Sequence, residues 1–572
     1  MAKGTGEFAL SFICVLLYLF FFDPRSADTL SVLQAFLSIG QYMNVAVHAF
    51  LISAAVAGLV VCLLHRSAYV RLVSAVLVFV PLAFGVGFHA VFQSNIQVTD
   101  LGVLWSGQNF VDDALITYSG VYLRAIGWAL VAGLGLLLLP AAVGLRFAPW
   151  ALVVPSSALL ASGLVLYETA GAFAFVPTPY ALPNLVLFSL TDPFYTGPRE
   201  TLTMRSTEPG YAKHMVLLMD ESVRGDMLSI NNHDRDTTPY LSSLDGDIVN
   251  LGVASSASNC SEYTHLVVRT GLRPDEIPDV TQRSLKKPDL AQFARNSGFR
   301  TFFLDGQWQH GKLHSFMRRA DLDHLDGFFQ AEGAECVTSG DCEVVEKIVQ
   351  IMTSNTRSFI YAVKKGVHVH YESSYPPSQR VFQPTLGAYE PMRDRERALN
   401  SYYNGIRWNV DRFFQALLPR IARQDYIILY TSDHGQHILE TASPLTHCQS
   451  DGPPAVQANV PMVIMAGSRE TRTVLEGALK GRHNRTSHFE IFPTLLVLFG
   501  YRKEFVNWEF GGTLFDATGV RRFYSGDVFG RRSGGGWSRS DGRLLGMGRR
   551  GEWRLFDADG GEDTTGAKPP GE

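Results

Sequence analysis

The sequence predicts a chain of two parts: five membrane-spanning helices, and then an α/β domain with a mostly parallel central sheet and helices on both faces. Three observations support this prediction. Long apolar runs occur only in the first third of the chain, and charged residues, 18% of the total, are scarce there. Beyond that point, short apolar runs alternate with helical stretches. Finally, 572 residues are too many for one core, because chains beyond about 250–300 residues usually divide.

Five apolar runs make up the first part, which we place at residues 1–175. They cover 8–22, 44–64, 72–93, 125–145 and 150–175. A helix needs about 20 apolar residues to cross the hydrocarbon layer, and the four later runs are long enough. The first run is shorter and has the length of a signal-peptide core. No A-x-A cleavage sequence follows it, so we expect a retained helix.

Charged residues between these runs predict the orientation of the helices. Basic residues precede the first run, lie between the second and third, and lie between the fourth and fifth: Lys3, His65, Arg66, Arg71 and Arg146. Segments rich in Lys and Arg stay preferentially in the cytoplasm. The loop 94–123 contains three aspartates and no Lys or Arg. We therefore expect everything after about residue 180 to lie outside the membrane.

The second part begins after a segment, 176–210, that is rich in Pro, Ser and Thr. Its prolines predict a linker without a long regular helix. We place the folded domain at 211–557. Arg- and Gly-rich residues 530–551 are expected to form a surface hairpin, and residues 558–572 a disordered tail.

Short apolar runs that end in polar residues recur through this domain, as expected of buried parallel strands. They are 214–222, 299–306, 358–368, 425–435 and 460–467. Helical stretches lie between and after them, at 341–352, 400–424 and 487–501. Strands that alternate with helices predict a mostly parallel sheet covered on both faces.

Charge and cysteine content narrow the class of protein. The formal net charge of −4 does not suggest a general nucleic-acid binder. Two of the six cysteines, Cys14 and Cys62, lie in apolar runs and are expected to be packing residues. The other four lie in the polar part: Cys260, Cys336, Cys342 and Cys448. An even number there fits an oxidising compartment, and counting alone leaves the pairing open.

Polar residues at the ends of two predicted strands can form a metal site. Asp220 and Glu221 end one strand, and Asp433 and His434 directly follow another. Parallel strands bring such residues to one edge of a sheet, so Glu221, Asp433 and His434 are expected to converge. Two carboxylates and one imidazole leave a fourth position for a reacting group, as in catalytic zinc sites. We expect one zinc ion, or two.

The reacting group is expected to be a hydroxyl. The segment 258–274 supplies Ser258, Ser261 and Thr264. A serine must lose its proton before it attacks phosphorus, and zinc can lower its pKa sufficiently without a histidine base. Spacing alone does not distinguish among the three hydroxyls.

Five motifs occur in an order that resembles a known family. They are "MDESVRGD", "TTPYL", "SNCS…TGLRP", "GVH" and "SDHG". This order is similar to that of the sulfatase-like branch of the alkaline phosphatase superfamily, and within it to the lipid A-type phosphoethanolamine transferases. The resemblance covers essentially the whole chain. It implies an alkaline-phosphatase-like domain, five membrane helices, and a place in a bacterial inner membrane with the catalytic domain in the periplasm.

The resemblance assigns roles to the predicted site residues. Glu221 matches the glutamate ligand of the family's "GES" motif, and Asp433 and His434 match the zinc ligands of "SDHG". Ser261 lies nine residues before Thr270, which is the sulfatase spacing between the nucleophile and "TG". Ser261 is therefore implied to be the nucleophile and a further zinc ligand, although the transferases usually have threonine there.

Three more residues are implied to bind substrate. His368 in "GVH" matches a histidine of "GSH" that binds the substrate phosphate. Asn459 stands in "NVP" where the family often has "HVP", so the usual histidine is replaced. His447 and His437 are available as substitutes, and we place His447 with His368 and Asn459 in the predicted substrate site.

Two further features follow from the same resemblance. Cys336 and Cys342 match a disulfide loop of these transferases, and five intervening residues can close such a loop. Arg224 matches a residue near the nucleophile loop, and a structural ion pair would explain it equally well.

The implied activity is transfer of phosphoethanolamine from phosphatidylethanolamine to an envelope acceptor, lipid A or a glycan, through a phosphoserine intermediate. Three alternatives were weighed. A true sulfatase needs Pro and Arg shortly after the nucleophile, and 262–265 contain neither. A phosphoglycerol transferase that uses phosphatidylglycerol would employ the same metal chemistry. A non-catalytic membrane scaffold could retain the fold, but a decayed site would usually have lost one of the four residue types.

Overall fold

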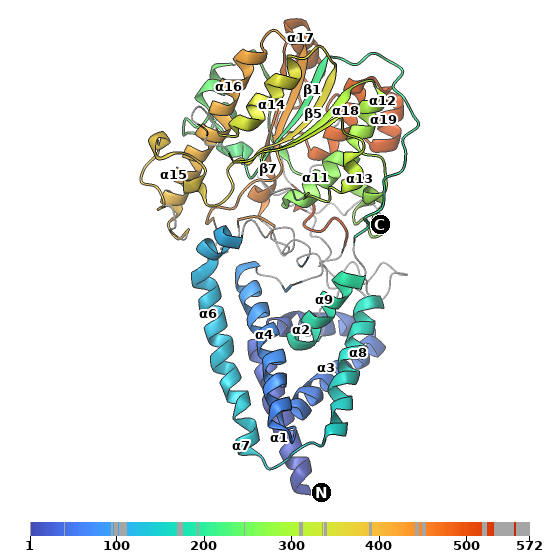
Figure 1. Ribbon diagram of the computed structural model, residues 1–572, viewed down its shortest axis with the longest axis vertical. Helices are drawn as coiled ribbons and strands as arrows, with labels where there is room; N and C mark the ends of the chain where they lie inside the picture. Colours follow the sequence, from blue (N-terminus) through green and yellow to red (C-terminus); the bar gives the residue numbers. More distant parts are fainter. Residues whose placement is uncertain are drawn as a thin grey trace. The chain divides into compact units, whose positions relative to one another are not determined.

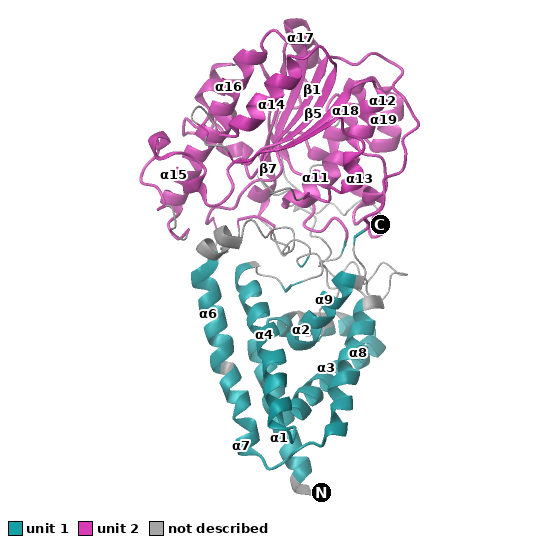
Figure 2. Cartoon of the chain, viewed as in Figure 1, with its two compact units in different colours: residues 1–194, 530–551 teal, residues 195–529, 552–572 magenta. Residues whose placement is uncertain are grey.

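The computed structural model divides the chain into two compact units, residues 1–194 with 530–551 and residues 195–529 with 552–572 (Figure 2). The structure describes residues 2–92, 95–96, 101, 111–168, 176–191, 194–530 and 554–555. Within these ranges, the residues that are not described are 39, 245, 308–312, 334–335, 337–339, 388–389, 391, 441–445, 449–453 and 518–522. The predicted hairpin at 530–551 and tail at 558–572 lie almost wholly outside the described residues.

The first unit is helical (Figure 1). Its helices are α1 (Ala2–Phe22), α2 (Arg25–Ser38), α3 (Tyr42–Leu63), α4 (Ala68–Phe92), α6 (Val111–Leu137), α7 (Leu139–Ala142), α8 (Val153–Glu168) and α9 (Thr178–Thr191). In the described part of the chain, five helical segments are long and apolar enough to cross a membrane. They correspond to the five predicted runs: Gly4–Phe22, Tyr42–Leu63, Ala68–Val91, Tyr118–Ala142 and Pro149–Leu166.

Apolar side chains lie both inside and outside this helical unit. Leu59 and Leu82 belong to its buried core, whereas Phe50, Leu77 and Leu160 are largely exposed. Soluble monomers rarely expose apolar patches larger than a few hundred Å². The exposed apolar surface therefore suits contact with lipid, as expected of a multi-pass membrane unit.

The prolines of 176–210 predicted a linker without a long regular helix, but Thr178–Thr191 form the 14-residue helix α9. Pro179 stands in the first turn, where its missing N–H has no partner within the helix in any case. The preceding N–H, that of Thr178, donates to the buried Asp23 carboxylate at 2.6 Å, and the Thr178 hydroxyl donates to the same group. Only Pro183 interrupts the helix interior. The units divide at 194, inside the segment predicted to be a linker.

The second unit contains a seven-stranded sheet with the order β2-β7-β6-β1-β5-β3-β4. Its strands are β1 (His214–Asp220), β2 (Val249–Ser255), β3 (Arg300–Asp305), β4 (Gly327–Gln330), β5 (Ser358–Val363), β6 (Tyr426–Ser432) and β7 (Asn459–Ala466). The four pairings among β6, β1, β5, β3 and β4 are parallel, and the two made by β7 are antiparallel. A short pair, β8 (Phe523–Tyr524) with β9 (Arg554–Leu555), lies apart from this sheet.

The five predicted strands are confirmed, and two strands of the seven-stranded sheet were missed. β2 contains Asn250 and Gly252, which interrupt the apolar pattern, and β4 has only four residues. Both strands lie at the edges of the sheet, where a continuous apolar run is not required.

Helices cover both faces of the sheet (Figure 1). One face carries α11 (Ser261–Thr270), α12 (Leu290–Asn296), α18 (Ile491–Phe499) and α19 (Lys503–Phe510); the other carries α14 (Cys342–Met352), α15 (Arg395–Ile406) and α16 (Arg412–Ile421). The short helices α10 (Pro239–Ser243), α13 (Arg319–Leu322) and α17 (Arg469–Ala478) complete the unit. The helix predicted at 400–424 is divided by a π-helical turn at Arg407–Asp411.

Alternation along β1 positions the site. Met215 and Leu217 face the α11 side, and Val216 and Leu218 face the α14 side. Consecutive residues at the end of a strand can therefore point to opposite faces of the sheet, into two different environments.

Candidate metal centre and catalytic site

Glu221, Asp433 and His434 converge beyond the carboxyl ends of β1 and β6. The two strands are parallel, with Asp220 opposite Ser432, so the residues that follow them are also neighbours. One ligand atom from each of the three lies within 4.8 Å of the others, and all three residues are buried. The structure thus brings together the three predicted ligands.

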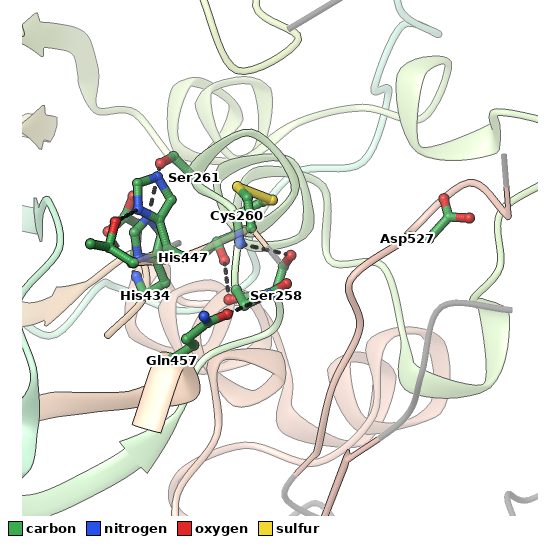
Figure 3. Close-up of a disulfide and its surroundings, with 12 residues drawn as sticks. Ser258, Cys260, Ser261, His434, His447, Gln457 and Asp527 are labelled. Atoms are coloured by element: carbon green, nitrogen blue, oxygen red, sulfur yellow. Dashed lines mark hydrogen bonds and ion pairs between the residues drawn. A yellow bond between two sulfur atoms is a disulfide. The ribbon is translucent and has the colours of Figure 1, made fainter. Parts of the chain in front are cut away.

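The Ser261 hydroxyl lies beside the His434 imidazole (Figure 3) and completes a cluster of four atoms with those of Glu221, Asp433 and His434. The His434 Nε2 atom lies 3.1 Å from Ser261 Oγ, 3.4 Å from Glu221 Oε1 and 3.5 Å from Asp433 Oδ2. Zinc holds nitrogen and oxygen ligands tetrahedrally at about 2.0–2.2 Å, which separates the ligand atoms by about 3.3–3.5 Å. These three spacings match that separation to within a few tenths of an ångström.

The charges of the cluster also suit a divalent cation. Burial and the neighbouring Glu221 raise the pKa of Asp433 to about 8. Burial lowers the pKa of His434, but the two carboxylates outweigh it and raise that pKa to about 9. Although burial raises the pKa of Glu221, the hydrogen bond and charge of His434 hold it well below its usual range. Two buried carboxylates thus compete for one imidazolium, and in the described residues Asp433 Oδ2 accepts no hydrogen bond. This donor set fits zinc.

Two residues that the sequence did not single out hold the Glu221 carboxylate in place. The Ser222 hydroxyl donates to Glu221 Oε1 at 2.7 Å, and the Gln307 amide donates to Oε2 at 2.9 Å. The Ser222 backbone N–H also donates to Asp433 Oδ1. Ser222 adopts a φ of 64°, a left-handed conformation that non-glycine residues adopt mainly where the surrounding contacts impose it. The sequence could have indicated both residues, because Ser222 directly follows Glu221 and Gln307 lies two residues beyond the end of β3.

Of the three candidate hydroxyls, Ser261 is the one that contacts the metal-binding atoms. Ser258 Oγ instead accepts the Cys260 backbone N–H, and Thr264 Oγ1 donates to the Ser258 carbonyl. Ser261 is the first residue of α11, a ten-residue helix. The positive end of the helix dipole therefore lies at the hydroxyl, where it favours an alkoxide or a phosphoryl oxygen.

Two of the predicted substrate residues lie beside this cluster. The His447 ring stacks on the His434 ring, with centroids 4.4 Å apart and planes at 18°. The His368 ring meets His447 edge-on at 5.7 Å. Asn459, the first residue of β7, is buried, and within the described residues no hydrogen bond joins its side chain to the cluster.

Arg224 and His437 form a separate group. The Arg224 guanidinium pairs with Asp226 and with Glu440, both at 2.5 Å. His437 Nε2 lies 3.8 Å from the same Glu440 carboxylate. These contacts agree with the ion-pair interpretation of Arg224.

Four cysteines form two disulfides. The predicted bond between Cys336 and Cys342 is present. The second joins Cys260 to Cys448, a pairing that the sequence left open, and it lies next to Ser261 and His447 (Figure 3).

Fold and site together define a class of protein: an α/β domain in which a helix-borne hydroxyl lies against a candidate metal centre at the carboxyl ends of the strands. The chain belongs to the sulfatase family, whose sequence profile, described as "Sulfatase", matches residues 213–501, about half of the chain.

Several relatives of this chain are named phosphoethanolamine transferases. Phosphoethanolamine transferase EptC of Escherichia coli (strain K12) is 22% identical over 267 residues, 45% of either chain. Kdo(2)-lipid A phosphoethanolamine 7''-transferase of the same strain is 23% identical over 319 residues, 53% of this chain and 54% of the relative. The chain therefore matches about half the length of these relatives.

A solved structure confirms the fold class. Lipooligosaccharide phosphoethanolamine transferase A of Neisseria meningitidis, an integral membrane protein, has a TM-score of 0.58 and 17% identity, and the likeness covers 86% of this chain and 97% of that one. The likeness therefore extends over both the helical part and the α/β domain.

Proposed function

We propose that this protein is a zinc-dependent phosphoethanolamine transferase that uses phosphatidylethanolamine as donor and an envelope molecule, lipid A or a glycan, as acceptor. The observation that carries the proposal is the Ser261 hydroxyl beside Glu221, Asp433 and His434. The names of the relatives support phosphoethanolamine as the transferred group. The five apolar helices suit an inner-membrane protein whose α/β domain lies in the periplasm.

Glu221, Asp433, His434 and Ser261 would hold the zinc ion. When bound, zinc supplies Lewis-acid chemistry that favours a deprotonated serine and offsets negative charge on the phosphoryl group. All four residues come from rigid positions: two strand ends and the first turn of a helix. That rigidity keeps the nucleophile aligned for attack.

The transfer then proceeds in two displacements at phosphorus. The Ser261 hydroxyl gives up its proton to water as Oγ forms a bond to the phosphorus of the donor. The bond to the glycerol oxygen breaks, that oxygen takes up a proton from water, and diacylglycerol leaves. Phosphoethanolamine is then esterified to Ser261. An acceptor oxygen attacks the same phosphorus, the serine ester breaks, and the Ser261 hydroxyl regains a proton. His368 and His447 donate hydrogen bonds to the phosphoryl oxygens, and the amino end of α11 favours their negative charge.

Anchoring in the donor's own bilayer raises the effective concentration of the lipid. Binding restricted to two dimensions reduces the translational freedom that must be lost before reaction. The membrane helices are thus expected to contribute to rate even though they carry no reacting group.

Intact-mass analysis of the full chain after incubation with zinc and phosphatidylethanolamine tests this proposal. We expect a mass gain of one phosphoethanolamine in the wild-type protein and in Thr264→Val, which removes a neighbouring hydroxyl of the same helix. Ser261→Ala should show no gain and keep its zinc. A gain only with phosphatidylglycerol would make the protein a phosphoglycerol transferase. No adduct with either lipid, from a protein that binds zinc, would contradict the covalent route.

A further inference from the structure

The Cys260–Cys448 disulfide connects two distant segments at the candidate site (Figure 3). Cys260 directly precedes Ser261, and Cys448 directly follows His447. The two cysteines are 188 residues apart in the sequence, so the bond joins the start of α11 to a loop that follows β6. Each cysteine is thus next in the chain to a residue of the proposed mechanism.

The contacts around this disulfide form a closed ring. Ser261 Oγ lies 3.1 Å from His434 Nε2, the His434 ring stacks on the His447 ring at 4.4 Å, and the chain continues from His447 to Cys448. The disulfide then returns to Cys260 and so to Ser261. The nucleophile, a metal ligand and a phosphate-binding histidine are therefore linked in one ring of contacts.

The His447 segment needs such a tether. Cys448 adopts a φ of 57°, a left-handed conformation that costs free energy for any residue with a Cβ. Its backbone N–H donates to the Asn259 carbonyl at 2.8 Å, and the Thr446 carbonyl accepts the His437 N–H at 2.7 Å. These hydrogen bonds can exchange with water, whereas the disulfide cannot. The covalent bond therefore fixes the segment against α11.

We propose that Cys260 and Cys448 are positioning residues for transfer. Their disulfide holds His447 against His434 and Ser261, so that turnover depends on this bond, whereas zinc binding and folding do not. The inference rests on the proposed function for its catalytic consequence. It also makes the activity conditional on oxidation, so the chain becomes competent only in a compartment that forms disulfides.

The second disulfide provides a matched control. Cys336 and Cys342 are six residues apart and close a short local loop at the start of α14. Neither cysteine adjoins a residue of the proposed mechanism. Loss of this bond removes the same number of sulfur atoms from the same unit without releasing His447.

The first experiment measures kcat, KM and zinc content for Cys260→Ala/Cys448→Ala and for Cys336→Ala/Cys342→Ala, each with His447 intact and with His447→Ala. Variants replace chemical reduction because thiol reductants also bind zinc. With His447 intact, loss of the Cys260–Cys448 bond should lower kcat on the order of 10–100-fold, the effect of a small misplacement in an active site, and leave zinc content unchanged. With His447→Ala, the same loss should have no further effect, because residues that act through one another are not additive.

Three results would overturn the inference: an unchanged kcat, the same fold-loss in both backgrounds, or loss of zinc with the disulfide. The Cys336→Ala/Cys342→Ala variant should have a kcat within about twofold of that of the protein with both disulfides. A matching loss there would indicate a general effect of removing a disulfide.

A second measurement is independent of turnover. The full chain without lipid is treated with diethyl pyrocarbonate, and modification of His447 is followed by peptide mass spectrometry. His447 should react several-fold faster in Cys260→Ala/Cys448→Ala than in the wild type or in the control variant. An equal rate would overturn the positioning role. If the wild type formed no phospholipid adduct, the proposed function would fail, and this rate would still test the positioning.

Discussion

Two consecutive carboxylates at the end of β1 lie in opposite environments. The Asp220 carboxylate turns to the α14 side, where Lys364 Nζ donates to it at 2.6 Å and the Tyr430 hydroxyl donates at 3.0 Å. Lys364 Nζ also lies 4.0 Å from Asp341 and donates to the Asn409 carbonyl. Burial raises the pKa of Asp220 to about 6, against the lowering effect of Lys364. This group has its own buried cation.

Glu221, one residue further, lies with Asp433 and His434, and within the described residues no ion pair joins either carboxylate to a lysine or arginine. Like charges buried together disfavour ionisation, so this group is incomplete without a cation. The balance of charge within a buried cluster therefore indicates its role. A cluster balanced by its own chain supports structure, whereas a cluster with an excess of one sign indicates a ligand of the opposite sign.

Asp433→Asn should have the largest effect, because it removes a charge from the unbalanced cluster. We expect zinc retention to fail and transfer to drop about 1000-fold or more, which corresponds to about 4 kcal/mol. Without metal, the variant should be at least as stable as the metal-free wild type, since the buried Asp433 carboxyl, which must take up a proton on folding because its pKa is raised to about 8, is gone. Zinc analysis, turnover and unfolding in a chelator measure these effects. A variant that kept zinc and turnover would remove Asp433 from the site.

Lys364→Met, in contrast to Asp433→Asn, should lower the stability of the fold. It leaves Asp220 and Asp341 buried without their cation, so we expect the free energy of unfolding to fall by about 3–5 kcal/mol. Denaturant unfolding of the full chain measures the change. The control is Asp220→Asn/Lys364→Met, which should recover part of the loss because only one of the two carboxylates, Asp341, is then buried without its cation. If the single variant were as stable as the wild type, the contrast between the two clusters would not hold.

His214 is a buried base at the opposite end of β1. Its Nδ1 atom forms a hydrogen bond with Ser358 Oγ at 2.7 Å. Burial, with help from the Lys213 charge, lowers the pKa of His214 to about 4. The unfolded chain binds this proton near pH 6.5, so stability should decline as pH falls below 6.5 and level off below about 4. Between pH 7.5 and pH 5 the loss should be about 2 kcal/mol. His214→Asn should flatten the pH profile of unfolding by that amount, and an unaltered profile would contradict the assignment.

Glu346→Gln should have the smallest effect. Its carboxylate pairs with Arg420 at 2.5 Å between α14 and α16, but both side chains are substantially exposed, at 65% and 41%. The hydrogen bond and charge of Arg420 lower the pKa of Glu346. Exposed pairs contribute less than about 1 kcal/mol, so denaturant unfolding should change by less than that. A loss as large as that of Lys364→Met would mean that burial does not govern these differences.

Apolar runs and the order of the motifs made both parts of the chain predictable from the amino-acid sequence. Five long runs predicted the membrane helices, and five short runs predicted the inner strands, because burial on both faces requires uninterrupted apolar residues. Glu221, Asp433 and His434 could be grouped since parallel strands bring their carboxyl ends to one edge. The short loop from Cys336 to Cys342 matched a family pattern and is present.

Other features required contacts that local patterns do not reveal. Edge strands β2 and β4 carry too little apolar pattern to be predicted, and the Asp23 carboxylate, 155 residues away, accepts the N–H of Thr178 at the start of α9. The family resemblance implied Ser261 as the nucleophile, but its contact with His434, the Cys260–Cys448 bond and the stacking of His447 all depend on contacts between segments distant in sequence. Local patterns encode burial and backbone preference, whereas the partner of a hydroxyl, a thiol or a charge is fixed only when the chain has folded.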